Sequence, residues 1–121
     1  MDTRSKILSF QAAPRACTVV TGAFDPLLAE DARELAEVRA SHPDRPLLVV
    51  VLPLSQELLP LRARAELVAA LRMIDYVVTA HEIDPDALLR ALKPALLVRL
   101  EDAQAVRKRQ LIEHVHHRQS T

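Results

Sequence analysis

Short apolar runs alternate along this chain with longer segments in which apolar residues recur at helical spacing. The short runs are continuous rather than alternating, which is typical of strands buried on both faces of a sheet. They predict strands over residues 16–21, 47–52, 75–80 and 95–100. The longer segments, each with one apolar face, predict helices over residues 26–40, 61–72, 84–92 and 101–119.

Strict alternation of strands and helices predicts an α/β fold. We expect a three-layer, Rossmann-like parallel sheet of about four strands with helices on both faces. Residues 1–15 are expected to form a loose N-terminal arm, with a helical turn around Lys6–Phe10, and residues 16–121 a single domain. Ligands of such sheets bind beyond the carboxyl ends of the strands. The corresponding tips are Gly22–Pro26, Pro53–Pro60, Thr79–Glu82 and Arg99–Asp102.

Side-chain patterns predict which side of two helices faces the protein and where a third helix begins. In the 61–72 helix, the spacing turns Leu67, Val68 and Leu71 inward and Arg64, Glu66 and Arg72 outward. The 84–92 helix begins with Asp84 as N-cap and Pro85 at the first helical position. In the 101–119 helix, one side carries Ala105, Leu111, Ile112 and Val115 within a strongly basic segment.

Composition narrows the classes of partner. Sixteen basic residues balance sixteen acidic ones, and Phe10, Phe24 and Tyr76 are the only aromatic residues. We therefore expect neither nucleic acid nor a membrane as partner. The single Cys17 excludes an internal disulfide, and we read no secretion signal and no bilayer-spanning run, so the expected location is cytoplasmic. Cys17 itself is expected to be a buried core residue rather than a nucleophile.

The chain's only glycine, Gly22, ends the first apolar run immediately before a helical pattern. A strand followed by a tight turn and a helix can form a phosphate cradle, because the helix N-terminus offers unpaired N–H groups. An ordinary turn that binds nothing fits this pattern equally well. In either case we expect Gly22 to lie where a side chain or a negative φ would not be tolerated.

The segment Gly22–Leu27, which reads Gly-Ala-Phe-Asp-Pro-Leu, resembles the opening of the cytidylyltransferase-like nucleotidylyltransferases. That family has glycine, any residue, phenylalanine, aspartate, two residues, and then His-x-Gly-His. Arg64–Val78 and Lys93–Arg99 are similar to the segments around the family's third and fourth strands. The resemblance covers roughly residues 17–102, and ADP-heptose synthase and glycerol-3-phosphate cytidylyltransferase domains are the most similar members.

The resemblance implies transfer of a nucleotidyl group from CTP or ATP to a phosphorylated small molecule, with release of pyrophosphate and usually with Mg²⁺. By the same resemblance, the nucleotide would be bound by Gly22, Ala23, Phe24, Asp25 and Arg64. Arg64 could reach a phosphate, or it could be an ordinary solvated helix residue.

This sequence departs from the family where phosphate is held. Leu28-Ala29-Glu30-Asp31 stands in place of His-x-Gly-His, so both histidine positions, Leu28 and Asp31, are changed. A carboxylate about 4 Å from a phosphate oxygen costs about 1 kcal/mol in water and about 4 kcal/mol at an effective dielectric of 20. Losing one charge-stabilising donor typically costs 100- to 1,000-fold in rate. The loop Pro53–Leu61 also has no basic residue, and a later serine/threonine-arginine stretch has no counterpart.

Three functions remain open. The first is a degenerate, catalytically impaired nucleotidylyltransferase-like protein that acts as a binding, regulatory or assembly module. The second is an active nucleotidyltransferase that uses Arg62, Arg64 or Arg99 for the phosphates. The third is an unrelated α/β interaction domain. A four-stranded sheet has two edges, which the C-terminal helix of this chain or of a second copy in a homodimer could cover.

Two metal-binding alternatives are weaker than the structural interpretation of the same residues. Asp25 and Asp31, six residues apart, could hold Mg²⁺, or they could simply cap the helix and complement its dipole. His114 and His117, three residues apart, have a spacing compatible with a metal, but a solvated tail explains them as well. The space above Gly22 is either open or plugged by Glu30, Asp31 and neighbouring side chains.

Overall fold

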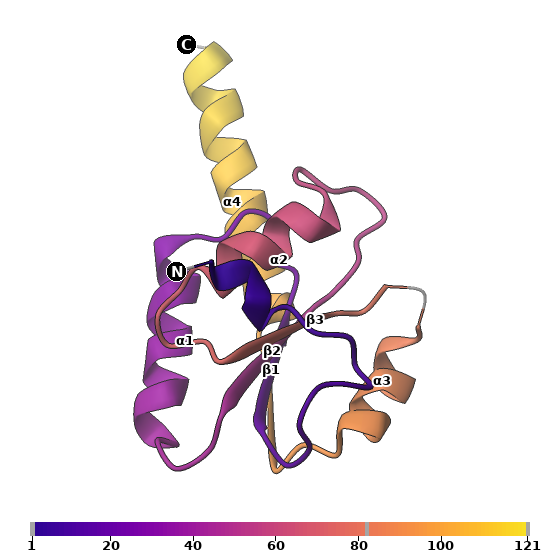
Figure 1. Ribbon diagram of the computed structural model, residues 1–121. Helices are drawn as coiled ribbons and strands as arrows, with labels where there is room; N and C mark the ends of the chain where they lie inside the picture. The colour runs from indigo at the N-terminus through magenta and orange to yellow at the C-terminus, as the bar shows by residue number, and fades with distance from the viewer. Residues whose placement is uncertain (1, 82, 121) are drawn as a thin grey trace.

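The computed structural model describes residues 2–81 and 83–120, and a four-stranded parallel sheet forms its central layer (Figure 1). The strands are β1 (Thr18–Gly22), β2 (Leu47–Val51), β3 (Tyr76–Thr79) and β4 (Leu96–Arg99). The helices are α1 (Ala29–Ser41), α2 (Leu61–Ala69), α3 (Pro85–Leu92) and α4 (Glu101–Ser120), preceded by a short 3-10 helix, η1 (Thr3–Lys6). The strand order is β3-β2-β1-β4, and each ladder is parallel.

Both faces of the sheet are buried, as the continuous apolar runs predict. Val20, Val49 and Val77 lie in one row across three strands and pack beneath α1 and α2. On the other face, Val19 and Leu48 pack beneath α3 and the N-terminal arm. Helices on both sides confirm the predicted three-layer, Rossmann-like α/β fold (Figure 1).

The predicted element order and the start of α3 are confirmed, but several bounds shift. Asp84 accepts a hydrogen bond from the Ala87 N–H at 3.1 Å, with Pro85 at the first helical position. α1 begins at Ala29, three residues later than predicted, because Leu28 is extended and its N–H donates to the Asp31 carboxylate at 2.8 Å. α2 ends at Ala69 rather than at residue 72, and each strand is one or two residues shorter or shifted.

The predicted outward and inward sides of α2 are partly wrong. Arg64 is fully buried, whereas Leu67 is 45% exposed. Small and β-branched residues of α2, including Ala65 and Val68, pack against the sheet and turn Leu67 outward. Arg64 is drawn inward because backbone carbonyls surround its guanidinium, as described below.

The N-terminal arm is held against the sheet, contrary to the expectation of a loose arm. Its helical turn is η1 (Thr3–Lys6), earlier than the predicted Lys6–Phe10. Ile7 forms a parallel bridge with Val77, and the Leu8 N–H donates to the Val77 carbonyl at 2.8 Å. The outer edge of β3 is therefore met by the N-terminal arm, not by the C-terminal helix.

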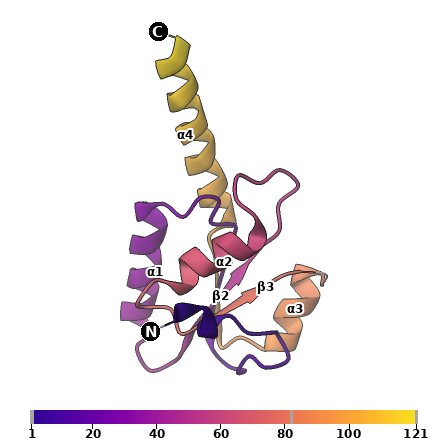
Figure 2. The same ribbon diagram turned by 45° about the horizontal axis from the view of Figure 1, so that its top comes forward.

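α4 leaves the sheet at the end of β4, and its C-terminal half projects away from the rest of the protein (Figures 1 and 2). On this half, Leu111, Ile112 and Val115 are each between 38% and 44% exposed. Among the described helices, none combines the length and apolar character that crossing a bilayer requires.

Candidate functional site

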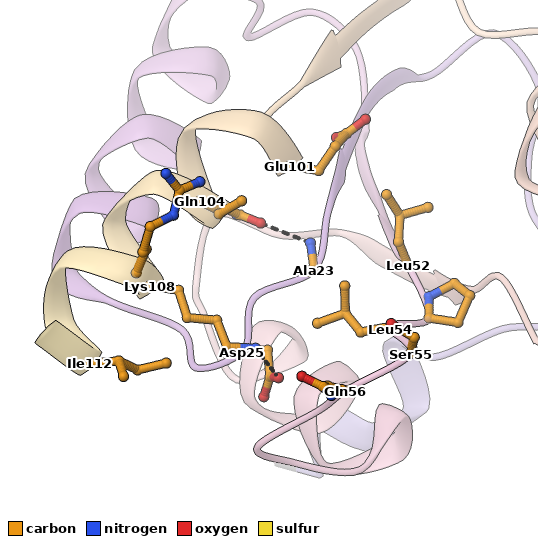
Figure 3. Close-up of a pocket in the computed structure, with 13 residues that line it drawn as sticks. Ala23, Asp25, Leu52, Leu54, Ser55, Gln56, Glu101, Gln104, Lys108 and Ile112 are labelled. Atoms are coloured by element: carbon orange, nitrogen blue, oxygen red, sulfur yellow. Dashed lines mark hydrogen bonds and ion pairs between the residues drawn. The ribbon is translucent and has the colours of Figure 1, made fainter.

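The loops after β1, β2 and β4 meet at the carboxyl end of the sheet, where the strand order reverses between β1 and β4. With the first turns of α4 they surround a cavity of about 550 Å³ (Figure 3). Ala23, Leu52, Leu54, Ala105 and Ile112 are among its lining residues and make much of the wall apolar. The predicted tip at residues 79–82 contributes nothing to this lining among the described residues, and Glu82 lies outside them.

Gln104 of α4 occupies the loop after β1, for which the sequence allowed either a phosphate cradle or an ordinary turn. This side chain is 6% exposed, and its Oε1 accepts hydrogen bonds from the N–H groups of Ala23 at 2.8 Å and Phe24 at 3.1 Å (Figure 3). Two converging backbone N–H groups are what a phosphate oxygen would use. In this structure, an amide oxygen of the protein itself satisfies both.

Gly22 is required by crowding rather than by its backbone angle. A Cβ built on Gly22 would lie 2.7 Å from both the Gln104 Oε1 and the Phe24 Cε2 atoms. Its φ is not positive, so that part of the expectation is wrong. The positive φ of this loop, 51°, belongs to Phe24, whose ring is fully buried. The space above Gly22 is thus filled by Gln104 and Phe24, not by Glu30 and Asp31.

Asp25 ties the loop after β2 to α4. Its carboxylate accepts from the N–H groups of Leu58 at 2.7 Å and Leu59 at 2.8 Å, and from the Lys108 Nζ at 2.9 Å (Figure 3). Burial raises the pKa of this carboxyl, but the hydrogen bonds and the charge of Lys108 outweigh burial, so the pKa lies below its ordinary value of 3.8. Asp25 is therefore an ionised structural anchor whose oxygens already have partners.

We expect Asp25 to contribute to acid sensitivity. Its folded-state pKa is depressed, so its stabilisation is present above the unfolded value of 3.8 and is lost as the pH falls through the folded value. Urea unfolding between pH 7 and pH 2.5 should show a smaller loss of stability for Asp25→Asn than for the wild type. Asp86→Asn, at an exposed position, should lose as much stability between pH 7 and pH 2.5 as the wild type. An equal loss for Asp25→Asn would contradict the role assigned to Asp25.

Both carboxylate oxygens of Asp31 also have partners within the protein. One carboxylate oxygen accepts from the Leu28 N–H at 2.8 Å, and the other pairs with Arg107 of α4. Arg107 also pairs with Glu34 at 2.6 Å. Burial lowers the pKa of Arg107, but these two carboxylates outweigh it and raise the pKa, which keeps the guanidinium charged. Asp31 is 1% exposed, whereas its neighbour Glu30 is exposed and pairs with Arg33 at 3.0 Å.

Arg64 joins the loops after β1 and β2 from the inside. Its guanidinium donates to the carbonyls of Leu59 at 3.0 Å, Ala23 at 2.8 Å and Leu52 at 2.8 Å, and to the Glu57 carboxylate at 2.9 Å. These four bonds use four of the five N–H donors of an arginine. The structure thus brings Arg64 beside the β1 loop, as the resemblance implies, but directs its donors to protein carbonyls.

The remaining candidates form no reactive or metal-binding cluster. Cys17 is 1% exposed, and burial, aided by Asp75, raises the pKa of its thiol, which disfavours the nucleophilic thiolate. Among the described residues, no group of three or more His, Cys, Asp or Glu side chains is placed to hold a metal ion. His114 and His117 lie on the projecting half of α4.

The fold and this crevice define the class: a parallel, Rossmann-like α/β protein in which the protein's own side chains fill part of the crevice at the carboxyl ends of the strands. Comparison of the chain with models of known protein families and with curated proteins finds no match.

Sequence reasoning missed the side chains that α4 contributes. Gln104, Arg107 and Lys108 contact the β1–α1 region from about 80 residues further along the chain. A signal was present, because Gln104 and Lys108 lie on the same helical face as Ala105 and Ile112 and so had to face the protein. The strongly basic composition of the segment made this protein-facing side of the helix difficult to recognise.

Removing the Gln104 side chain tests this arrangement. We expect Gln104→Ala to lose about 1–2 kcal/mol in urea unfolding, because two buried N–H groups lose their acceptor and water replaces it only in part. Amide hydrogen exchange at Ala23 and Phe24 should accelerate. Gln110→Ala, at an exposed position of the same helix, should match the wild type in both measurements. Unchanged exchange at Ala23 and Phe24 in Gln104→Ala would contradict the assignment.

Proposed function

We propose that this chain is a nucleotidylyltransferase-like protein that no longer catalyses nucleotidyl transfer and acts as a binding and assembly module. The observation that carries the proposal is the Gln104 oxygen on the N–H groups of Ala23 and Phe24. A triphosphate would have to displace this side chain before it could use the loop. Displacement would also have to leave the buried amide with new partners, which adds to the cost of binding.

The charges around the loop support the same proposal. Three cations around it already have carboxylate partners: Arg64 pairs with Glu57, Arg107 with Asp31 and Glu34, and Lys108 with Asp25. Phosphate transfer depends on donors and cations that are free to meet charge as it develops. Here Arg64, Arg107 and Lys108 instead hold α4 and the loops together.

The cavity beside this loop also suits binding better than phosphate chemistry. Leu52, Leu54, Ala105 and Ile112 contribute apolar wall, and a cavity of this size and character is typical of sites for apolar groups. A triphosphate placed there would lose water against this apolar wall, and the donors that also line the cavity, Ser55, Gln56 and Arg109, would have to replace that water. The second function, an active transferase, would have to rely on exposed cations such as Arg62, Arg99 or Arg109.

A pyrophosphate-release assay tests the proposal. Purified protein with Mg²⁺ and CTP or ATP, offered a panel of sugar phosphates and polyol phosphates, should release no pyrophosphate above a protein-free blank. Robust turnover would overturn the proposal. Turnover that disappears in Arg62→Gln or Arg99→Gln would establish the active transferase instead, and turnover that survives both variants would need another phosphate-binding group.

A further inference from the structure

The cavity beside the β1 loop has apolar walls that remain open to water. Leu54 is 37% exposed and Ile112 is 39% exposed, and both line this cavity of about 550 Å³. Leu52 continues the wall beside Leu54, while Ile112 belongs to the side formed by α4 (Figure 3). A cavity of this size holds a small molecule, and apolar walls in contact with water favour an occupant with an apolar body.

α4 contributes a cation to this apolar lining. Ala105, Arg109 and Ile112 all line the cavity, and their spacing of four and then three residues puts them on one face of the helix. Arg109 is exposed, and within the described part of the chain its guanidinium has no hydrogen-bond or ion-pair partner. A cation without a partner, placed between apolar side chains, suits a ligand that carries an anionic group on an apolar body.

The other charged side chains of the lining already have partners. Asp25 accepts a hydrogen bond from Lys108 at 2.9 Å. Glu101 accepts from the Thr21 hydroxyl at 2.7 Å, and its other carboxylate oxygen lies 3.7 Å from the Arg99 guanidinium. One available cation with two carboxylates in the same lining favours a ligand with a single negative charge over a polyphosphate, because the further charges of a polyphosphate would meet Asp25 and Glu101.

We propose that this cavity binds a small monocarboxylate, with its apolar body against Leu52, Leu54 and Ile112 and its carboxylate on Arg109. The inference rests on the binding role proposed above and names the class of ligand for it. Arginine pairs with a carboxylate through two parallel hydrogen bonds, and the exposed position of Arg109 lets the charged group stay partly hydrated. The apolar body adds affinity because its burial removes both the ligand and the cavity wall from water.

Two fluorescent probes that differ by one charge test the role of Arg109 on the full chain. Anilinonaphthalene sulfonate carries one anionic group on apolar rings, and N-phenylnaphthylamine has the same rings without that group. Arg109→Gln should weaken binding of the anionic probe about three- to tenfold and leave binding of the neutral probe unchanged. Arg90→Gln, at an exposed position of α3, should change neither. No saturable binding of the anionic probe by the wild type, or equal effects of Arg109→Gln on the two probes, would overturn the proposal.

A matched pair of larger side chains tests the place of binding, and decanoate tests the class of ligand. Ala103 and Ala105 are both exposed on α4, but Ala105 lines the cavity and Ala103 does not. Ala105→Phe should abolish saturable binding of both probes, Ala103→Phe should bind them like the wild type, and decanoate should displace the anionic probe from the wild type. Equal behaviour of the two variants, or no displacement by decanoate, would overturn the proposal.

These titrations contain no nucleotide, so they separate the ligand class from the non-catalytic function. Pyrophosphate release would overturn the non-catalytic function and leave the monocarboxylate site standing. Unchanged binding of the anionic probe in Arg109→Gln would overturn the monocarboxylate site and leave the non-catalytic function standing. Because Arg109 is exposed, this variant tests the proposal however Ala105→Phe folds.

Discussion

Replacing Arg64 with methionine is expected to lower the free energy of unfolding by about 3–5 kcal/mol. Methionine keeps much of the volume but leaves the carbonyls of Ala23, Leu52 and Leu59 without their buried donor. A loss of this size is a large part of the roughly 5–15 kcal/mol that stabilises an ordinary domain. Urea unfolding at pH 7, monitored by circular dichroism, measures it.

Arg62→Met provides the matched control two residues away. Arg62 is exposed, and its ion pair with Glu66 is a 3.3 Å contact between neighbouring turns of α2. Exposed pairs of this kind contribute little, so the variant should lie within about 0.5 kcal/mol of the wild type. Equal effects of Arg62→Met and Arg64→Met would contradict the role assigned to Arg64.

The second large effect is expected at Asp31. Asp31→Ala removes the acceptor for the Leu28 N–H and one of the two carboxylates that neutralise Arg107. Losing a helix cap costs about 1 kcal/mol, and leaving a buried charge partly unpaired costs more. Because Glu34 still pairs with Arg107, we expect a total loss of about 2–4 kcal/mol in thermal or urea unfolding.

Glu30→Ala separates this role from a general effect of negative charge at the start of α1. Glu30 is exposed and pairs only with Arg33 among the contacts described, so its removal should change stability by no more than about 0.5 kcal/mol. Asp31→His, which would restore a histidine of the family pattern, should also destabilise. If Asp31→His were as stable as the wild type and bound nucleotide, Asp31 would not be a structural anchor.

Periodicity was enough to predict the fold, because the two central strands, β1 and β2, are buried on both sides and the helices between the strands cover the sheet. The start of α3 was predicted as well, since Asp84 and Pro85 are local signals that need no tertiary contact. The bounds of α1 were less accurate, because its cap lies three residues inside the helix, at Asp31.

Long-range contacts explain what the sequence did not reveal. Arg64 was expected in solvent or at a phosphate, and the spacing of residues along its helix does not indicate that the loops after β1 and β2 bring their carbonyls to it. Gly22 was predicted to be sterically required, but one of the two side chains that crowd it, Gln104, lies 82 residues away. The pairing of Ile7 with Val77 is equally distant and turns an arm predicted to be loose into a cover for the sheet edge.

The central claim is that an oxygen of Gln104 takes the place of a phosphate oxygen at the loop after β1. The most direct test follows the backbone amide signals of Ala23 and Phe24 by NMR during titration of the wild-type protein with CTP and Mg²⁺, and then with ATP and Mg²⁺. Both signals should stay in place up to millimolar nucleotide. Saturable shifts of these two amides would show that nucleotide reaches the loop and would contradict it.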